Sequence, residues 1–271
     1  MKITLYFFVK IVYNFNDIEK ERGNKMLRYY YTIIVNLIRL LDALKTMNDM
    51  IKKSNDYPEE YVEEYGYGYV KYVIDVMKKT GKIETKVFGK ENLPKEGGYM
   101  MYPNHEGKWD VYGLMSVHKY PCSFVMDIKK SNRPFIKELV DILKGKRLSK
   151  TDNRQAMTII NEVAKEVESG RKYILFPEGD FDKEKKNGLW DFKAGCFKIS
   201  LKSKTPIIPV VLYDSWKVYN SMSVGKIESQ VHFLNPIYYE EYKDMSTRQI
   251  ADMVKGKIEE KLKEIEINNK K

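Results

Sequence analysis

The sequence contains few cysteines and few histidines for its length of 271 residues. Its two cysteines, Cys122 and Cys196, exclude a disulfide scaffold and a zinc site built on cysteine ligands. Such low cysteine usage is typical of a reducing compartment. The three histidines, His105, His118 and His232, leave only a small number of positions for acid–base chemistry near neutral pH.

A long hydrophobic run is also missing. No segment reaches the ~20 apolar residues that a membrane-spanning helix needs. Residues 3–15 come closest, but Lys10 interrupts them and no small-residue cleavage site follows. Met26 is an alternative start to Met1, in which case the residues before it do not belong to the protein. The composition is that of a globular chain, with 43% hydrophobic and 13% aromatic residues, which excludes a disordered or fibrous protein.

Acidic residues are outnumbered by basic ones, 38 to 48, and the formal net charge is +10. The excess is concentrated in two segments: residues 1–53 carry a net charge of +5 and residues 119–154 a net charge of +6. A basic balance of this size favours nucleic acid, an anionic membrane or an acidic substrate as the partner. The sequence has no RNA- or DNA-binding signature. We therefore favour a membrane surface for the first segment and an acidic donor or phosphate for the second.

The N-terminal segment has the pattern of amphipathic helices. Between residues 27 and 45 one side of the predicted helix is polar, with Arg28, Thr32, Asn36, Arg39, Asp42 and Lys45. The other side is apolar, with Ile33, Ile34, Leu37, Ile38, Leu41 and Leu44. A wide apolar face with excess positive charge suits a helix lying in an anionic membrane surface. Packing on the protein's own core is the alternative. A second helical period, in the tyrosine-rich segment 56–81, predicts a helix pair at about 26–53 and 58–79.

The pattern changes near residue 82 to short apolar strands that alternate with helices. Strands are expected near residues 83–87, 99–102, 122–126, 173–176, 207–212 and 230–234. This order predicts an α/β fold with an open mixed sheet flanked by helices, preceded by the amphipathic helix pair. We therefore divide the chain into a membrane-associating helical region, residues 1–81, and an α/β domain, residues 82–271.

A histidine and an aspartate follow the second expected strand. His105 comes directly after the strand end and Asp110 opens the next helix, a junction where sites form in open α/β proteins. A turn between them lets Asp110 accept a hydrogen bond from one ring nitrogen of His105, which leaves the other nitrogen as a base. The pair lacks the nucleophile of a hydrolase triad, which a substrate hydroxyl can replace. A solvated histidine at a helix start is the alternative interpretation.

Three further motifs lie in the connections of the expected sheet: Phe-Pro-Glu-Gly at 176–179, Asp-Phe-Lys-Ala-Gly at 191–195 and Thr-Pro-Ile-Ile-Pro-Val at 205–210. Together with Asn104, His105 and Asp110, which match an Asn-His-x4-Asp block, these motifs resemble the glycerolipid acyltransferase family in their order and separation. Within that family the resemblance is to 1-acylglycerol-3-phosphate acyltransferases. It covers about residues 82–240.

The resemblance implies acyl transfer from a coenzyme A or acyl-carrier-protein thioester to the hydroxyl of a lysophospholipid, 1-acylglycerol-3-phosphate, to give phosphatidic acid. It implies His105 as the general base, with Asp110 orienting it and no covalent acyl-enzyme. The thioester is a co-substrate, and no cofactor or metal ion is implied.

The same resemblance bears on partners and location. The implied partners are an anionic lipid surface and the acyl donor, with an acyl carrier protein as one form of that donor, and no nucleic acid. The implied location is the cytoplasmic face of the membrane, as a peripheral or monotopic protein. Residues 82–271 are then an acyltransferase domain.

The implied substrate-binding residues come from these blocks and the basic segment between them: Asn104, Lys150, Arg147, Arg154, Glu178, Gly179 and Lys193. Lys150 is the match to an arginine of the family, and lysine supplies charge without the bidentate fork of arginine. Asp180-Phe181 stands where the family carries Thr-Arg, and phenylalanine cannot hold a phosphate. A different lysolipid or a non-phosphate alcohol therefore stays open as the acceptor. A non-catalytic basic module that binds membranes is a further alternative.

Overall fold

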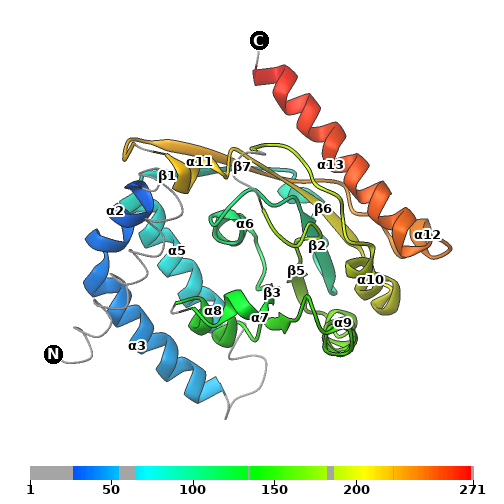
Figure 1. The fold of residues 1–271 in the computed structure, drawn as a ribbon, viewed down its shortest axis with the longest axis horizontal. Helices are drawn as coiled ribbons and strands as arrows, with labels where there is room; N and C mark the ends of the chain where they lie inside the picture. The colour runs from blue at the N-terminus through cyan, green and yellow to red at the C-terminus, as the bar shows by residue number, and fades with distance from the viewer. Residues whose placement is uncertain (1–26, 55–64, 134, 182–185, 222, 270–271) are drawn as a thin grey trace.

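The fold is known from a computed structural model, which describes residues 27–54, 65–133, 135–181, 186–221 and 223–269. Its centre is a seven-stranded sheet with the order β1-β7-β6-β2-β5-β3-β4 (Figure 1). The strands are β1 Ile83–Phe88, β2 Tyr99–Pro103, β3 Ser123–Asp127, β4 Lys146–Leu148, β5 Lys172–Ile174, β6 Ile207–Tyr213 and β7 Ile227–Phe233. The predicted strands are therefore confirmed as elements. Sequence reasoning missed β4, because three residues are too few to show a period of two.

The direction of the strands places the segments that follow them at one edge of the sheet. The pairs β2–β5, β2–β6, β3–β5 and β3–β4 are all parallel, so these five strands end at the same edge of the sheet. Only β6–β7 is antiparallel within the described sheet, and β1 runs parallel to β7. The sheet is mixed and open, as predicted. In open α/β folds a site forms at the carboxyl edge of the parallel strands.

Helices cover both faces of the sheet (Figure 1). The central strand β6 alternates between two hydrophobic clusters: Ile208 and Val210 belong to one, and Ile207 and Val211 to the other. This alternation is the period of two of a strand buried on both faces. The helices of the α/β part are α6 Asp110–Val117, α7 Ile128–Ser131, α8 Ile136–Ile142, α9 Asn153–Glu168, α10 Lys198–Ser203, α11 Lys217–Asn220, α12 Tyr239–Tyr242 and α13 Thr247–Asn269, with 3-10 helices η2 Lys90–Asn92 and η3 Ala194–Phe197.

The N-terminal helices pack on one side of the α/β part (Figure 1). They are α2 Leu27–Val35, α3 Leu37–Ser54 and α5 Tyr67–Gly81. The predicted first helix is thus divided near Asn36, and the start expected for the second, near residue 58, lies outside the described residues. Leu44 and Val70 belong to the same hydrophobic cluster as residues of the sheet. The division between residues 81 and 82 stays a prediction.

The polar side of α2 faces the protein. Arg28, Thr32 and Asn36 are each at most 2% exposed. The Arg28 guanidinium donates to the carbonyls of Gly81 and Ser223, at 2.7 Å in the second case. Because these polar groups find partners inside the protein, the apolar side of the helix is turned outward. None of the helices in the described ranges is long and apolar enough to cross a membrane.

Candidate active site

Two of the predicted motifs meet at the carboxyl edge of the parallel strands, whereas the motif at 205–210 enters β6 from the opposite edge. The segment from Asn104 to Asp110 follows β2, the Phe-Pro-Glu-Gly turn at 176–179 follows β5, and Asp127 ends β3. A turn at 214–216, directly after β6, joins them. These segments are far apart in sequence and share an edge only because their strands are parallel neighbours.

His105 and Asp110 form the hydrogen bond that the sequence predicts. His105 Nδ1 lies 2.7 Å from Asp110 Oδ2. The side chain of His105 is 17% exposed, and that of Asp110 is 0% exposed. Because an ionised carboxylate only accepts, the hydrogen lies on Nδ1 and Nε2 of the neutral ring carries the lone pair. The imidazole is therefore arranged as a base that solvent can still reach.

The Asp110 carboxylate receives three further hydrogen bonds. Its Oδ2 accepts from the backbone N–H groups of Glu106, at 2.6 Å, and Gly107, at 2.9 Å. Its Oδ1 accepts from the Ser215 hydroxyl at 2.5 Å. Hydrogen bonds to the charged form favour a carboxylate. Sequence reasoning missed Ser215, because nothing in the sequence links a serine after β6 to an aspartate that opens α6.

Two phenylalanine rings bracket the His105 imidazole. Phe176 stacks on it with 4.2 Å between centroids, and Phe181 lies edge-on at 4.7 Å. Both aromatic rings come from the segment after β5. Such contacts hold a ring in one orientation at little cost in polar desolvation.

Asn104 and Glu178 connect the segments of the site to each other. The Asn104 amide donates to the Leu212 carbonyl at 2.9 Å, and its oxygen accepts from the Leu212 N–H at 2.7 Å. The Glu178 carboxylate accepts from the backbone N–H groups of His105 and Trp190, both at 3.0 Å. Both side chains are buried, at 0% and 4% exposed. These hydrogen bonds hold the segments in place, and the role of the two residues in substrate binding stays a prediction.

Gly179 and Lys193 lie against one another. Gly179 has a φ of +76°, and a Cβ added there would be 2.6 Å from the Lys193 Nζ. The backbone N–H of Lys193 donates to the Pro177 carbonyl at 2.9 Å. The positive φ of the turn favours glycine at this position, whereas the end of the flexible lysine side chain could move aside. Lys193 itself is exposed beside this turn.

The predicted basic residues separate into one near the site and two away from it. Lys150 Nζ lies 3.3 Å from Asp127 Oδ2 and 3.7 Å from Asp180 Oδ2. Arg147 pairs instead with Asp141 of α8, at 2.6 Å. Arg154 is exposed at the start of α9, where its backbone N–H donates to Asp152 and its carbonyl accepts from the Thr158 hydroxyl.

Lys130, which the sequence did not single out, joins Lys150 beside the histidine. Its Nζ is 2.7 Å from Asp180 Oδ1 and 5.7 Å from the centre of the Phe181 ring. Because Phe181 also contacts His105, the Lys130 ammonium group lies about one aromatic ring from the base, and Asp180 pairs with both Lys130 and Lys150. A charged headgroup attached to a substrate at His105 would meet them.

The other two histidines have ordinary structural environments. His118 directly follows α6, and a cation at a helix C-terminus would interact favourably with the helix dipole, but the structure does not leave His118 charged. His118 is 0% exposed, its Nδ1 donates to the Tyr120 carbonyl, and its Nε2 accepts from the Tyr99 hydroxyl at 2.8 Å. Burial lowers the pKa of His118 to about 4, so the ring is neutral at pH 7. His232 is likewise neutral, with a pKa lowered to about 4 by burial.

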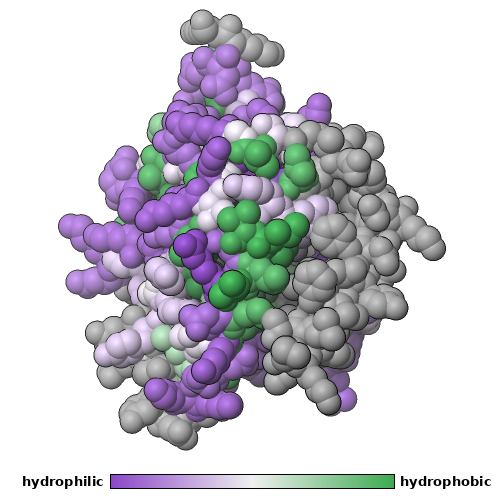
Figure 2. Space-filling model, turned by 90° about the vertical axis from the view of Figure 1, so that its left-hand side faces the viewer, coloured by the Kyte–Doolittle hydropathy of each residue, from purple (hydrophilic) through white to green (hydrophobic). Residues whose placement is uncertain are grey.

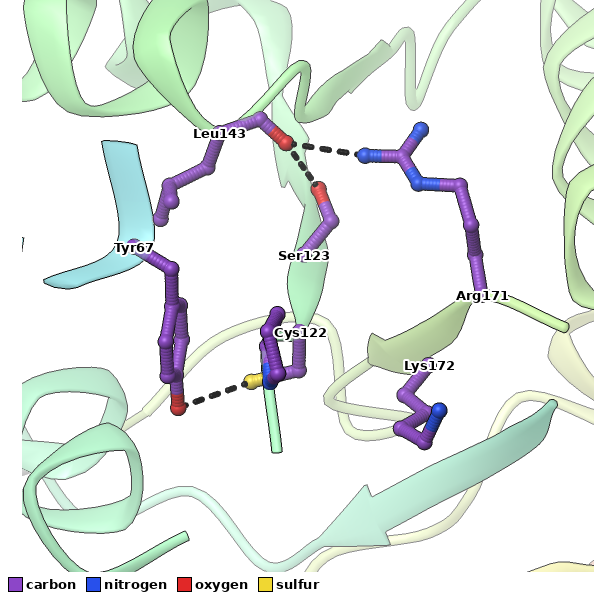
Figure 3. A pocket seen from close by; sticks show the side chains of 7 residues that line it. Tyr67, Cys122, Ser123, Leu143, Arg171 and Lys172 are labelled. Atoms are coloured by element: carbon purple, nitrogen blue, oxygen red, sulfur yellow. Dashed lines mark hydrogen bonds between the residues drawn. The ribbon is translucent and has the colours of Figure 1, made fainter. Parts of the chain in front are cut away.

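A small pocket lies away from this site. Figure 3 shows it between Tyr67, Cys122 and Arg171, at about 10 Å³, which is near the smallest size that holds one water molecule. The polar groups on its wall are paired with each other: Ser123 and Arg171 both donate to the Leu143 carbonyl. It is a packing feature beside β3.

Comparisons with known proteins agree with this geometry. The Acyltransferase family matches residues 84–213, a range that contains His105, Asp110, the turn at 176–179 and all of β6. Over these residues, just under half of its length, the chain is similar to the acyltransferase family. This confirms the resemblance that the motif order indicated.

Relatives and a solved structure are similar over a longer part of the chain. The 1-acyl-sn-glycerol-3-phosphate acyltransferase of Saccharomyces cerevisiae is 27% identical over 197 residues, which cover 70% of this chain and 63% of that protein. The enzyme of the same name from Borreliella burgdorferi is 25% identical over 189 residues, 68% of this chain and 74% of that protein. The crystal structure of the Thermotoga maritima 1-acyl-sn-glycerophosphate acyltransferase has a TM-score of 0.71 at 15% identity, covering 90% of this chain and 98% of that one. It shares the fold.

Proposed function

We propose that this chain transfers a fatty acyl group from a coenzyme A or acyl-carrier-protein thioester to the hydroxyl of a lysophospholipid, 1-acylglycerol-3-phosphate, to form phosphatidic acid. The observation that carries the proposal is the oriented His105–Asp110 pair at the carboxyl edge of the sheet, beside the ammonium groups of Lys130 and Lys150. The names of the relatives support the acceptor class.

The proton movements follow from the tautomer of His105. Nε2 takes the proton of the acceptor hydroxyl as its oxygen attacks the thioester carbonyl carbon. The ester bond forms, the carbon–sulfur bond breaks, and the leaving thiolate takes the proton back from the imidazolium. Asp110 stabilises the imidazolium through the Nδ1 hydrogen bond of 2.7 Å. No enzyme nucleophile is required, because the acceptor hydroxyl attacks directly.

The acceptor phosphate is assigned to the cluster of Lys130, Lys150, Asp127 and Asp180. A phosphate monoester at the sn-3 position is separated from the reacting sn-2 hydroxyl by a short glycerol link, which matches the position of Lys130 one ring beyond His105. Lysine ammonium groups bind phosphate as point charges. Asp180 already pairs with both lysines, so the phosphate competes with an internal anion. That competition keeps a less anionic lysolipid open as an alternative acceptor.

The membrane surface is assigned to the outward face of α2 and α3. Leu27, Ile34, Val35 and Ile38 are 48% to 83% exposed there. Figure 2 shows apolar side chains gathered into one patch on the side of the molecule where Figure 1 places these helices. Cations at Arg39, Lys45, Lys52 and Lys53 are exposed on α3. A large apolar face with basic residues beside it suits the interfacial region of an anionic bilayer.

The proposed membrane face is physically connected to the site. Lys108, in the segment between His105 and Asp110, lies 4.8 Å from the ring centre of Tyr29 on α2. Tyr29 also meets Tyr219 of α11 edge-on, at 5.1 Å. A lysolipid in the same bilayer therefore has a short path to His105. We assign the protein to the cytoplasmic face of the membrane, as a peripheral or monotopic enzyme.

Replacement of His105 by alanine tests the activity. With purified protein, an acyl-coenzyme A and 1-acylglycerol-3-phosphate, thiol release and phosphatidic acid formation should fall by about 10²- to 10⁴-fold, the range for loss of a general base. His232→Gln is the matched control, because His232 lies on β7 away from the site and is neutral. Full activity in His105→Ala would refute the catalytic assignment. Wild-type protein that acylates no lysolipid, with either thioester, would refute the function.

A further inference from the structure

The second carboxylate oxygen of Asp110 accepts a hydrogen bond from a residue that has no direct part in the proposed reaction. Asp110 Oδ1 accepts the Ser215 hydroxyl at 2.5 Å, while Oδ2 faces His105. Ser215 is 4% exposed and Asp110 is 1% exposed, so neither group exchanges this bond for water. A buried carboxylate oxygen without a donor would be costly, and the carboxylate would be free to turn about its terminal torsion.

A second contact locks the same two segments. The backbone N–H of Trp216 donates to Glu106 Oε2 at 3.2 Å, and Glu106 is 1% exposed. Glu106 lies between His105 and Asp110 in one segment, and Trp216 follows Ser215 in the other. The turn after β6 thus holds the catalytic segment after β2 through a side chain and a backbone bond. The parallel pairing of β2 and β6 places both segments at this edge.

We propose that Ser215 is a positioning residue for the His105 base, whose hydroxyl fixes the Asp110 carboxylate so that Oδ2 accepts the Nδ1–H. The consequence is a single imidazole tautomer, with Nε2 aimed at the acceptor hydroxyl. The kinetic part of this inference rests on the proposed function, whereas the state of the imidazole does not.

The geometry also separates Ser215 from a serine nucleophile. In a hydrolase triad the histidine lies between serine and aspartate and takes the serine proton. Here Asp110 lies between Ser215 and His105, and the serine hydroxyl donates a hydrogen bond to the Asp110 carboxylate. The carboxylate that accepts from Ser215 is a much weaker base than an imidazole, so we expect no acyl-enzyme on Ser215 and an action through Asp110 alone.

The test compares Ser215→Ala with Ser215→Thr, which retains the hydroxyl. In Ser215→Ala we expect kcat to fall by about 10- to 100-fold with little change in KM for either substrate, because misplacement of a catalytic group by an ångström costs about 10²-fold. The acidic limb of the kcat/KM profile should move to higher pH, since a carboxylate with one donor fewer favours the imidazolium. Ser215→Thr should recover the wild-type profile.

An activity-independent readout and a control complete the design. The low-field proton resonance of the His105 Nδ1–H, assigned by its loss in His105→Ala, should shift or broaden in Ser215→Ala. Ser123→Ala is the control. Ser123 is also buried, at 2% exposed, and its hydroxyl donates to the Leu143 carbonyl. It begins β3 and so lies at the opposite end of that strand from the catalytic edge. The control variant should leave the resonance and the pH profile unchanged.

Several outcomes would overturn the inference. Ser215→Ala with the wild-type kcat, pH profile and resonance would do so, as would an acyl group found on Ser215 after incubation with thioester alone. If Ser215→Ala does not fold, Ser215→Cys takes its place, since a thiol is a weak donor of similar size. Wild-type activity in that variant would count equally against the proposal. If the wild-type chain transfers no acyl group, the proposed function fails and the proton resonance still decides the role of Ser215.

Discussion

The ring of Phe181 lies edge-on against the imidazole of His105, with 4.7 Å between their centroids. The preceding residue, Asp180, turns the other way and pairs with Lys130 at 2.7 Å. The Phe181 ring therefore packs on the imidazole of His105, while the Asp180 carboxylate forms ion pairs with the neighbouring lysines. At the two positions where the family motif carries Thr-Arg, this chain has Asp180 and Phe181, so the cation of the motif is missing and an anion and an aromatic ring are present.

Asp180→Asn should improve the use of a phosphomonoester acceptor. Removal of the internal anion frees Lys130 and Lys150 for the phosphate, so the KM for 1-acylglycerol-3-phosphate should fall by about 2- to 5-fold, the range expected of a partly exposed ion pair. Lys150→Ala should raise the same KM. Steady-state kinetics at fixed thioester concentration gives both values.

Asp191→Asn is the control for the acceptor kinetics, since Asp191 is 82% exposed at its side chain and pairs with Lys255 of α13. An acceptor KM that responds to Asp191 as much as to Asp180 would contradict the assignment. Equal KM values in wild type and Asp180→Asn would do the same.

Ile34→Glu combined with Ile38→Glu should weaken membrane binding. These side chains are 63% and 83% exposed, so the change costs the folded protein little but places charge in the proposed apolar contact. We expect co-sedimentation with anionic vesicles to fall by at least about tenfold, given ~1.5–3 kcal/mol for each buried aliphatic side chain. Ile267→Glu, at a 58% exposed position on α13, should bind vesicles like wild type. Undiminished binding of the double variant would exclude this face.

Stability should depend on pH through His118. Its pKa is about 4 in the folded protein and ~6.5 in the unfolded chain, so the unfolded state binds the proton first as the pH falls. The free energy of unfolding should therefore decrease between about pH 6.5 and pH 4, by up to about 3 kcal/mol from this group, and no further below pH 4. Urea unfolding of wild type and His118→Gln at pH 7 and pH 4.5 measures the difference. The variant should show a shallower loss, and an identical loss in both proteins would disprove a buried neutral His118.

Asn104→Ala should lower both stability and activity. It leaves the N–H and C=O of Leu212, which is 1% exposed, without partners in the interior. The free energy of unfolding should fall by about 2–3 kcal/mol, and acyl transfer should fall with it because the segment of His105 loses its tie to β6. Asn92→Ala is the matched control. Its amide donates a single recorded bond, to the Phe233 carbonyl at 2.9 Å, at a partly exposed position, and a smaller loss is expected.

The fold was predictable because its signals are local. The strand β6 is a continuous apolar run, and its seven residues are all buried. The last helix begins as its capping box predicts: the Ser246 N–H donates to Gln249 Oε1 at 2.8 Å, and the Gln249 N–H donates to Ser246 Oγ at 3.3 Å. Residues close in sequence determine such features, so a single sequence reveals them.

The direction in which an amphipathic helix faces was not a local property. Two sides of α2 were evident from the sequence, but which one meets the protein depended on distant partners. Arg28 finds carbonyls of Gly81 and Ser223, and Thr80 donates to Asn36 Oδ1 at 3.1 Å. With its polar side satisfied inside, the helix exposes the side that a soluble protein would normally bury.

By itself the sequence determined the resemblance to the acyltransferase family, the order of the strands apart from β4, and the His105–Asp110 pair. The pair could be read because its two residues are five positions apart and one turn can join them. Only the tertiary structure decided which other groups serve the pair. Ser215 contacts Asp110, and the two phenylalanines contact His105, through the parallel pairing of β2 with β5 and β6. The pairing of β5 with β3 brings Lys130 to the Phe181 ring. The physical reason is that pairing brings the ends of parallel strands together regardless of their separation in sequence. Such contacts produce no periodicity or fixed spacing in the sequence from which they could be predicted.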